Sequence, residues 1–152
     1  MNYVIGGTLA TIVSSNVVNN IITNLITTIY GGTLFLRYGR DNNSMIEKYK
    51  NEIEEMDIAI KLEIIQNKLT SQCGMDKDKE NEKNKSVQIL GLLELIFKIK
   101  SIMENINYEI EKHNNKWFSS YRSVNISNKL NDLRHYVKIL DNRIQLYNLN
   151  RL

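Results

Sequence analysis

Residues 89–110 read ILGLLELIFKIKSIMENINYEI, and their apolar side chains recur at alternating steps of three and four residues. A helix puts such positions on one face, whereas a strand would need strict alternation. The stretch therefore predicts a long amphipathic helix, which opens at Ser86. The positions on the repeat are Ile89, Leu92, Ile96, Ile99, Met103, Ile106 and Ile110.

The same repeat occurs on both sides of this stretch. Upstream, Ser44 and Glu47 form an S-x-x-E capping box that opens a helix expected to run to about Cys73. Its apolar positions are Ile46, Tyr49, Ile53, Met56 and Ile60. Residues 75–85 are almost all charged or amide and predict a solvated loop. Downstream, the repeat returns at Leu130, Leu133, Val137, Leu140, Ile144 and Tyr147. We therefore expect an all-α fold, with an elongated three-helix antiparallel bundle of coiled-coil-like heptads over residues 44–152.

The N-terminal segment differs sharply in charge from the rest of the chain. Residues 1–36 contain no charged side chain; the first is Arg37, and charges are dense from Asp41 onward. Gly6-Gly7 and Gly31-Gly32 bracket an apolar stretch and predict the ends of one helix. The boundaries expected from this pattern are a hydrophobic membrane-anchor or docking helix in 1–36, a linker in 37–43 and the bundle in 44–152.

The predicted N-terminal helix has two faces. Its apolar stripe, which would contact a membrane or a partner, consists of Ile12, Val13, Val17, Val18, Ile21, Ile22, Leu25, Ile26 and Ile29. Its opposite face is polar but uncharged, which is unusual for a helix surface in water, and is expected to associate with other protein. This polar face consists of Asn16, Asn19, Asn20, Thr23 and Asn24.

Three arrangements fit this segment. It spans a membrane with its amide face against other copies or proteins, it lies buried as a protein-facing helix in a large assembly, or it folds back onto its own bundle. The last is placed third, because apolar pairs that recur every four residues do not match heptads. If the segment spans, Arg37 and Arg40 follow it and no basic residue precedes it, so the bundle would lie on the cytoplasmic-equivalent side of a single-pass membrane protein.

Composition and motifs argue against several functional classes. The net charge of +3 comes from interleaved acids and bases rather than a concentrated basic face, so no nucleic-acid partner is expected. Cys73 is the only cysteine, which excludes an intramolecular disulfide. His113 and His135 lack the spacing of metal ligands, so both are expected on the surface or in loops. We find no catalytic constellation and no phosphate-binding motif. The expectation is a protein that is not an enzyme and has no metal, no cofactor and no small-molecule substrate.

Basic and aromatic residues cluster between the last two predicted helices. These residues are Lys116, Trp117, Phe118, Tyr121 and Arg122. Aromatic side chains beside cations anchor at membrane surfaces and at protein contacts, so the cluster is one candidate interface patch. The alternative is that the aromatic side chains cover the open end of the bundle core.

The composition also carries a signal of origin. Asn and Ile each occur 21 times and Ala twice, a bias toward AT-rich codons. An uncharged N-terminal segment followed by an Asn-, Ile- and Lys-rich helical bundle resembles the small structural membrane proteins of large DNA viruses. The resemblance rests on composition and implies a membrane-anchored structural or scaffolding protein, associated with the virion as a minor capsid or inner-membrane component. The alternative function is a soluble helical adaptor whose first helix docks in a groove of a partner protein.

Overall fold

The computed structural model describes residues 15–38, 44–72, 79–116 and 123–149 of the chain. Every regular element in these ranges is an α-helix, which confirms the expected all-α class for the described part. The helices are α2 (Ser15–Tyr38), α3 (Ser44–Glu54), α4 (Ile58–Gln72), α5 (Lys79–Asn114) and α6 (Ser127–Leu149).

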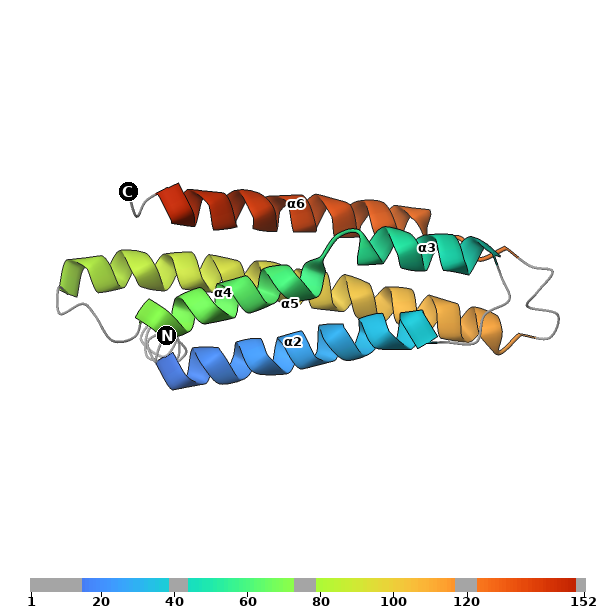
Figure 1. The fold of residues 1–152 in the computed structure, drawn as a ribbon, viewed down its shortest axis with the longest axis horizontal. Coiled ribbons are helices and arrows are strands. Elements are labelled where there is room, and N and C mark those ends of the chain that lie inside the picture. The colour runs from blue at the N-terminus through green and yellow to red at the C-terminus, as the bar shows by residue number, and fades with distance from the viewer. Residues whose placement is uncertain (1–14, 39–43, 73–78, 117–122, 150–152) are drawn as a thin grey trace, which may run out of the picture.

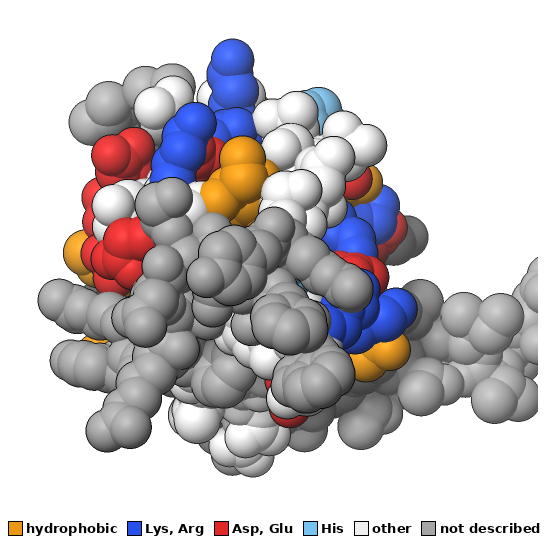
Figure 2. Space-filling view, turned by 90° about the vertical axis from the view of Figure 1, so that its right-hand side faces the viewer, with side chains coloured by type: hydrophobic (Ala, Val, Ile, Leu, Met, Phe, Trp, Pro, Cys, Tyr) orange, Lys and Arg blue, Asp and Glu red, His pale blue; other side chains and the backbone are white. Residues whose placement is uncertain are grey.

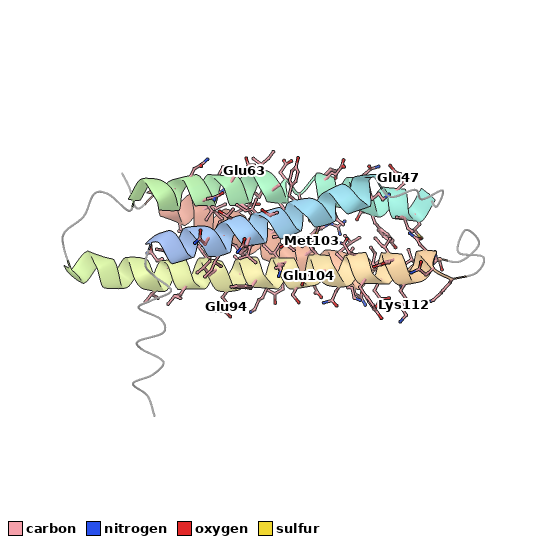
Figure 3. All side chains as sticks on the ribbon, turned by 90° about the horizontal axis from the view of Figure 1, so that it is seen from below. Glu47, Glu63, Glu94, Met103, Glu104 and Lys112 are labelled. Atoms are coloured by element: carbon pink, nitrogen blue, oxygen red, sulfur yellow. The ribbon has the colours of Figure 1, made fainter. Side chains whose placement is uncertain are left out.

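The described helices form an elongated four-helix bundle, in which α3 and α4 are consecutive halves of one rod (Figure 1). Rods that follow one another along the chain run antiparallel. The helix α2 packs on α4 and α5, and α6 packs on the same two helices. α2 therefore lies between the antiparallel helices α4 and α5 (Figure 3).

The helix α2 belongs to the bundle core and is not a segment separate from a three-helix bundle. Ile22, Leu25 and Ile29 are at most 3% exposed, and Ile21 and Ile26 pack against the same core. For residues 15–36, the part of this segment that the structure describes, the arrangement observed is the third one, in which the helix packs on its own chain. The apolar pairs of α2 recur every four residues, but only one member of a pair is fully buried. The buried members, Ile22, Leu25 and Ile29, follow steps of three and four residues, so they match the repeat of the other helices. None of the helices in the described ranges is long and apolar enough to cross a membrane.

The helices α5 and α6 follow the predicted repeats. On α5 the buried repeat positions are Leu92, Ile96, Ile99, Met103, Ile106 and Ile110. On α6 they are Leu130, Leu133, Val137 and Leu140. Ile89 and Ile144 are half-buried against the same core. The start of α5 lies at Lys79 rather than Ser86, because residues 79–85 hold neither Gly nor Pro and their Glu and Lys residues are good helix formers.

The predicted single helix from Ser44 to Cys73 is wrong, because it breaks between α3 and α4. Asp57 has a left-handed backbone with a φ of 50°. Its amide bonds the oxygen of Glu54 at 3.1 Å, and its own oxygen accepts the amide of Lys61 at 3.1 Å. The first bond closes α3 and the second opens α4.

The break changes which apolar residues face the core. Ile60, expected inside, is 57% exposed, whereas the buried positions of α4 are Ile58, Leu62 and Ile65. An unbroken repeat would carry Glu63 next into the core. The left-handed turn rotates α4 so that three apolar side chains are buried instead.

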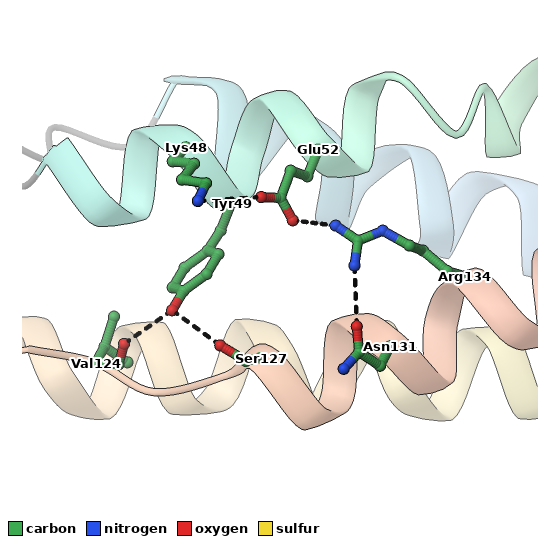
Figure 4. A network of polar contacts seen from close by, with 7 residues as sticks. All are labelled: Lys48, Tyr49, Glu52, Val124, Ser127, Asn131 and Arg134. Atoms are coloured by element: carbon green, nitrogen blue, oxygen red, sulfur yellow. Dashed lines mark hydrogen bonds and ion pairs between the residues drawn. The ribbon is translucent and has the colours of Figure 1, made fainter.

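Polar contacts fasten α3 to the start of α6 (Figure 4). The Tyr49 hydroxyl donates to the main-chain oxygen of Val124 at 3.3 Å and lies 3.5 Å from Oγ of Ser127. Arg134 on α6 pairs with Glu52 on α3. These contacts fix how α3 and α6 sit along one another and leave α2 on the far side of the bundle.

Candidate protein-interaction surface

The outward face of α2 carries no charged side chain at any exposed position that the structure describes. We call its residues the uncharged α2 face: Asn20, Thr23, Asn24, Thr27, Thr28, Tyr30 and Gly31. Charged residues make up 24% of this chain, and the solvent-facing sides of helices normally carry them. The exposed side of α2 therefore differs from an ordinary solvated helix surface.

The threonines of this face are held by hydrogen bonds. The hydroxyl of Thr27 donates to the main-chain oxygen of Thr23, and that of Thr28 donates to the oxygen of Asn24, both at 2.8 Å. Nε2 of Gln66 on α4 donates to Oγ1 of Thr23 at 2.7 Å. Because the hydroxyl protons of Thr27 and Thr28 are engaged within the helix, these side chains offer outward only methyl groups and oxygen lone pairs.

Charged side chains border the uncharged α2 face on both sides. Figure 3 looks at the bundle from the side of α2, with Glu47 and Glu63 along one border and Glu104 along the other. On α5, Lys98 pairs with Glu94 at 3.5 Å and Lys100 with Glu104 at 3.3 Å. Figure 2, a view of one end of the bundle, likewise shows acidic and basic side chains intermixed over the described surface. The uncharged α2 face thus lies between charged surfaces.

The structure divides the predicted apolar stripe of the N-terminal segment. Ile22, Leu25 and Ile29 are core residues, and Ile21 and Ile26 are half-buried at its edge. The described part of the stripe therefore faces the chain's own core. Val17 and Val18 lie in α2, but their side chains, like all of Ile12 and Val13, lie outside the described residues.

The predicted polar face is found on the surface where the structure describes it. Asn20, Thr23 and Asn24 are exposed, and the side chains of Asn16 and Asn19 lie outside the described residues. The exposed face extends beyond these residues to Thr27, Thr28, Tyr30 and Gly31. The Gly31-Gly32 pair, predicted to end this helix, lies inside α2, which continues to Tyr38.

The predicted patch between the last two helices is only partly described. Lys116 is exposed and lies two residues after the end of α5. The residues outside the described ranges are Trp117, Phe118, Tyr121 and Arg122. Both interpretations of this patch therefore stay predictions.

Other exposed apolar side chains are scattered over the bundle. Ile60 and Ile64 on α4 are 57% and 40% exposed, and Phe97 on α5 is 50% exposed. The isoleucine pair was missed because the break at Asp57 was not foreseen. Single exposed apolar residues and small pairs of this kind are normal on protein surfaces.

The titratable side chains of the described helices include two histidines in different surroundings. Within the described ranges, no three His, Cys, Asp or Glu residues lie close enough together to hold a metal ion. His113, expected at the surface, is buried with 5% exposure at the end of α5, whereas His135 is exposed and its ring meets that of Tyr136 edge-on at 5.4 Å.

Comparison with protein-family models, with curated proteins and with solved structures finds no match to this chain.

Proposed function

We propose that this protein is a non-enzymatic structural scaffold that binds protein through the uncharged α2 face. The supporting observation is that the seven exposed positions described on α2, between residues 20 and 31, carry no charge. In the whole chain, 24% of the residues are charged. The buried centres of protein interfaces are depleted in Asp, Glu and Lys, because removing a charge from water is costly unless it is paired. A surface that will be covered by protein avoids this cost by having no charges.

The chemistry of the face suits a protein partner. Asn20 and Asn24 each offer a donor and an acceptor, so hydrogen bonds to a partner can replace those lost to water. Tyr30, half exposed at the same face, is a residue type enriched in interfaces. The soluble-adaptor hypothesis therefore changes in one respect: docking uses the outward polar face of α2, because its apolar stripe is occupied by the core.

A membrane-attached scaffold is the second candidate, since residues 1–36 carry no charge. In this form the bundle lies on the cytoplasmic-equivalent side of the membrane, or within a virion. The burial of Ile22, Leu25 and Ile29 inside the bundle favours the first candidate. Carbonate extraction of the tagged full-length chain separates the two: release into the supernatant supports the scaffold without an anchor, and retention in the pellet supports attachment through the N-terminal segment.

Site-specific photo-cross-linking tests the binding surface. A photoreactive residue replaces Thr27 in the full-length chain, and a matched control replaces the exposed Asn142 on α6. After irradiation of the producing cells we expect discrete covalent protein adducts from position 27 and none of comparable yield from position 142. Equal labelling at both positions, or no adduct at position 27, would contradict a binding role for the uncharged α2 face.

A further inference from the structure

We infer that the rod formed by α3 and α4 is a conformational switch with two folded states. In the bent form, which is the one observed, the rod breaks at Asp57 (Figure 1). In the straight form the helix continues through Asp57, α4 is turned by about half a turn around its axis, and a second set of apolar side chains enters the core. This inference is independent of the binding role proposed for the uncharged α2 face.

The backbone at the break favours the straight form. Residues 44–72 contain neither glycine nor proline, the residues that most often kink or end a helix. Asp57 nevertheless has a φ of 50°, which costs free energy for a residue with a Cβ. The amides of Met56 and Asp57 reach oxygens only three residues back, at 3.2 and 3.1 Å, a poorer hydrogen-bond geometry than that of an α-helix. The break therefore depends on the side chains that α4 buries.

The helix α4 has apolar side chains on two opposite sides. One side holds Ile58, Leu62 and Ile65, each at most 4% exposed. The other holds Ile60 and Ile64, which are 57% and 40% exposed. At about 100° per residue, the centres of these two sides lie about 150° apart around the helix axis. A turn of α4 would therefore replace one apolar side with the other.

The exposed side of α4 continues the buried repeat of α3. The repeat before the break consists of Ile46, Tyr49, Ile53 and Met56. In a helix continued through Asp57, Ile60 and Ile64 would lie within about 40° of the centre of this stripe. The three residues that α4 buries in the bent form would then lie on the far side. Exposure alone would not single out Ile60 and Ile64, but their position on this repeat gives the straight form a core face.

The side chains of α4 favour the bent form. It buries three apolar side chains of α4, whereas the straight form would bury two. Straightening would also bring Glu63, which is exposed in the bent form, toward the core, where a carboxylate loses its hydration. Glu63 is thus the residue that keeps the straight form a minor state.

The switch changes what α4 contacts and what it presents. In the bent form Nζ of Lys61 pairs with Asp141 on α6 at 2.9 Å, and Gln66 donates to Thr23 on α2 at 2.7 Å. Turning α4 would break both contacts. It would also bring the side of Ile58 and its two neighbours on the repeat to the outside, so that the surface of α4 becomes more apolar.

Thiol labelling of the folded full-length chain tests the switch. Ile60→Cys or Leu62→Cys supplies the single thiol in a Cys73→Ser background. Two variants are compared with each reporter: both carry Glu63→Leu, and they differ only in Asp57→Ala against Asp57→Gly. Alanine favours the continuous helix, whereas glycine accepts the left-handed turn without strain. Relative to the glycine variant, the alanine variant should label at least about threefold more slowly at position 60 and at least about tenfold faster at position 62.

The opposite changes at the two positions distinguish a turn of α4 from its unfolding, which would speed labelling at both. Faster labelling at both positions in the alanine variant would overturn the inference, as would equal rates in the two variants. An alanine variant that circular dichroism shows to be unfolded would also overturn it, because the straight form is a folded bundle. Slower labelling at position 60 together with faster labelling at position 62 would support it.

Discussion

The guanidinium group of Arg143 on α6 donates a hydrogen bond to the main-chain oxygen of Gly91 on α5. A Cβ built on residue 91 would lie 2.9 Å from Nη1 of Arg143, closer than side-chain carbons normally approach. Glycine at position 91 therefore admits the arginine to the backbone of α5. Since α5 and α6 form one of the two hairpins of the bundle, this contact joins the helices along their packed length.

A double-mutant cycle at these two residues should be non-additive. Ala at position 91 improves helix propensity by about 1 kcal/mol but forces the Arg143 guanidinium away from its acceptor. We expect Gly91→Ala to stabilise the wild type less than it stabilises the Arg143→Ala variant, by about 0.5 kcal/mol or more. Urea unfolding of the four proteins measures the difference. Equal gains in both backgrounds would mean that the contact contributes nothing.

The break between α3 and α4 can be tested by two isoleucines two positions apart. Ile58 is 4% exposed and Ile60 is 57% exposed. Ile58→Asp should lower the free energy of unfolding by about 3 kcal/mol or more, because it loses apolar burial and buries an unpaired carboxylate. Ile60→Asp is the control and should change it by less than about 0.5 kcal/mol. The reverse order in thermal or urea unfolding would support an unbroken helix from Ser44 onward.

Asp57 holds the left-handed conformation at this break. An L-residue with a Cβ loses roughly 1 kcal/mol in this region, whereas glycine does not. We therefore expect Asp57→Gly to be more stable than Asp57→Ala by about 1 kcal/mol. Both variants remove the same carboxylate, so their comparison isolates the backbone. If Ala is as stable as Gly in urea unfolding, the turn is not left-handed in solution.

The elements with an uninterrupted repeat could be predicted from the sequence. On α5, the repeat from Leu92 to Ile110 names the buried positions, and the capping box at Ser44 marks the start of α3. The break at Asp57 was not foreseen, because its signal is indirect. A pattern search sees Ile60 continue the repeat, and only Glu63 and the apolar residues Ile58 and Leu62 show that the repeat fails.

The position of α2 could not be predicted for a different reason. A segment with no charge is compatible with lipid, with a partner or with its own core, and the repeat alone does not distinguish them. The structure distinguishes them by burial: Leu25 of α2 lies in the core of the bundle, and its neighbour Asn24 is exposed. The polar face was identified from its lack of charge, but its extension to Gly31 depended on seeing that α2 continues through the glycine pair to Tyr38.

The membership of α2 in the core leads to a cooperative unfolding prediction. Leu25→Ala should lower the free energy of unfolding by about 2–5 kcal/mol, the usual cost of a buried leucine. Hydrogen exchange should show this loss in the slowest amides of α5 and α6 as well as in α2, because the helices share one core. Asn24→Ala, one residue away and exposed, is the control and should stay within about 0.5 kcal/mol of the wild type. Were α2 a separate docking or anchor helix, Leu25→Ala would change exchange in α2 alone and leave the protection of α5 and α6 as it is in the wild type.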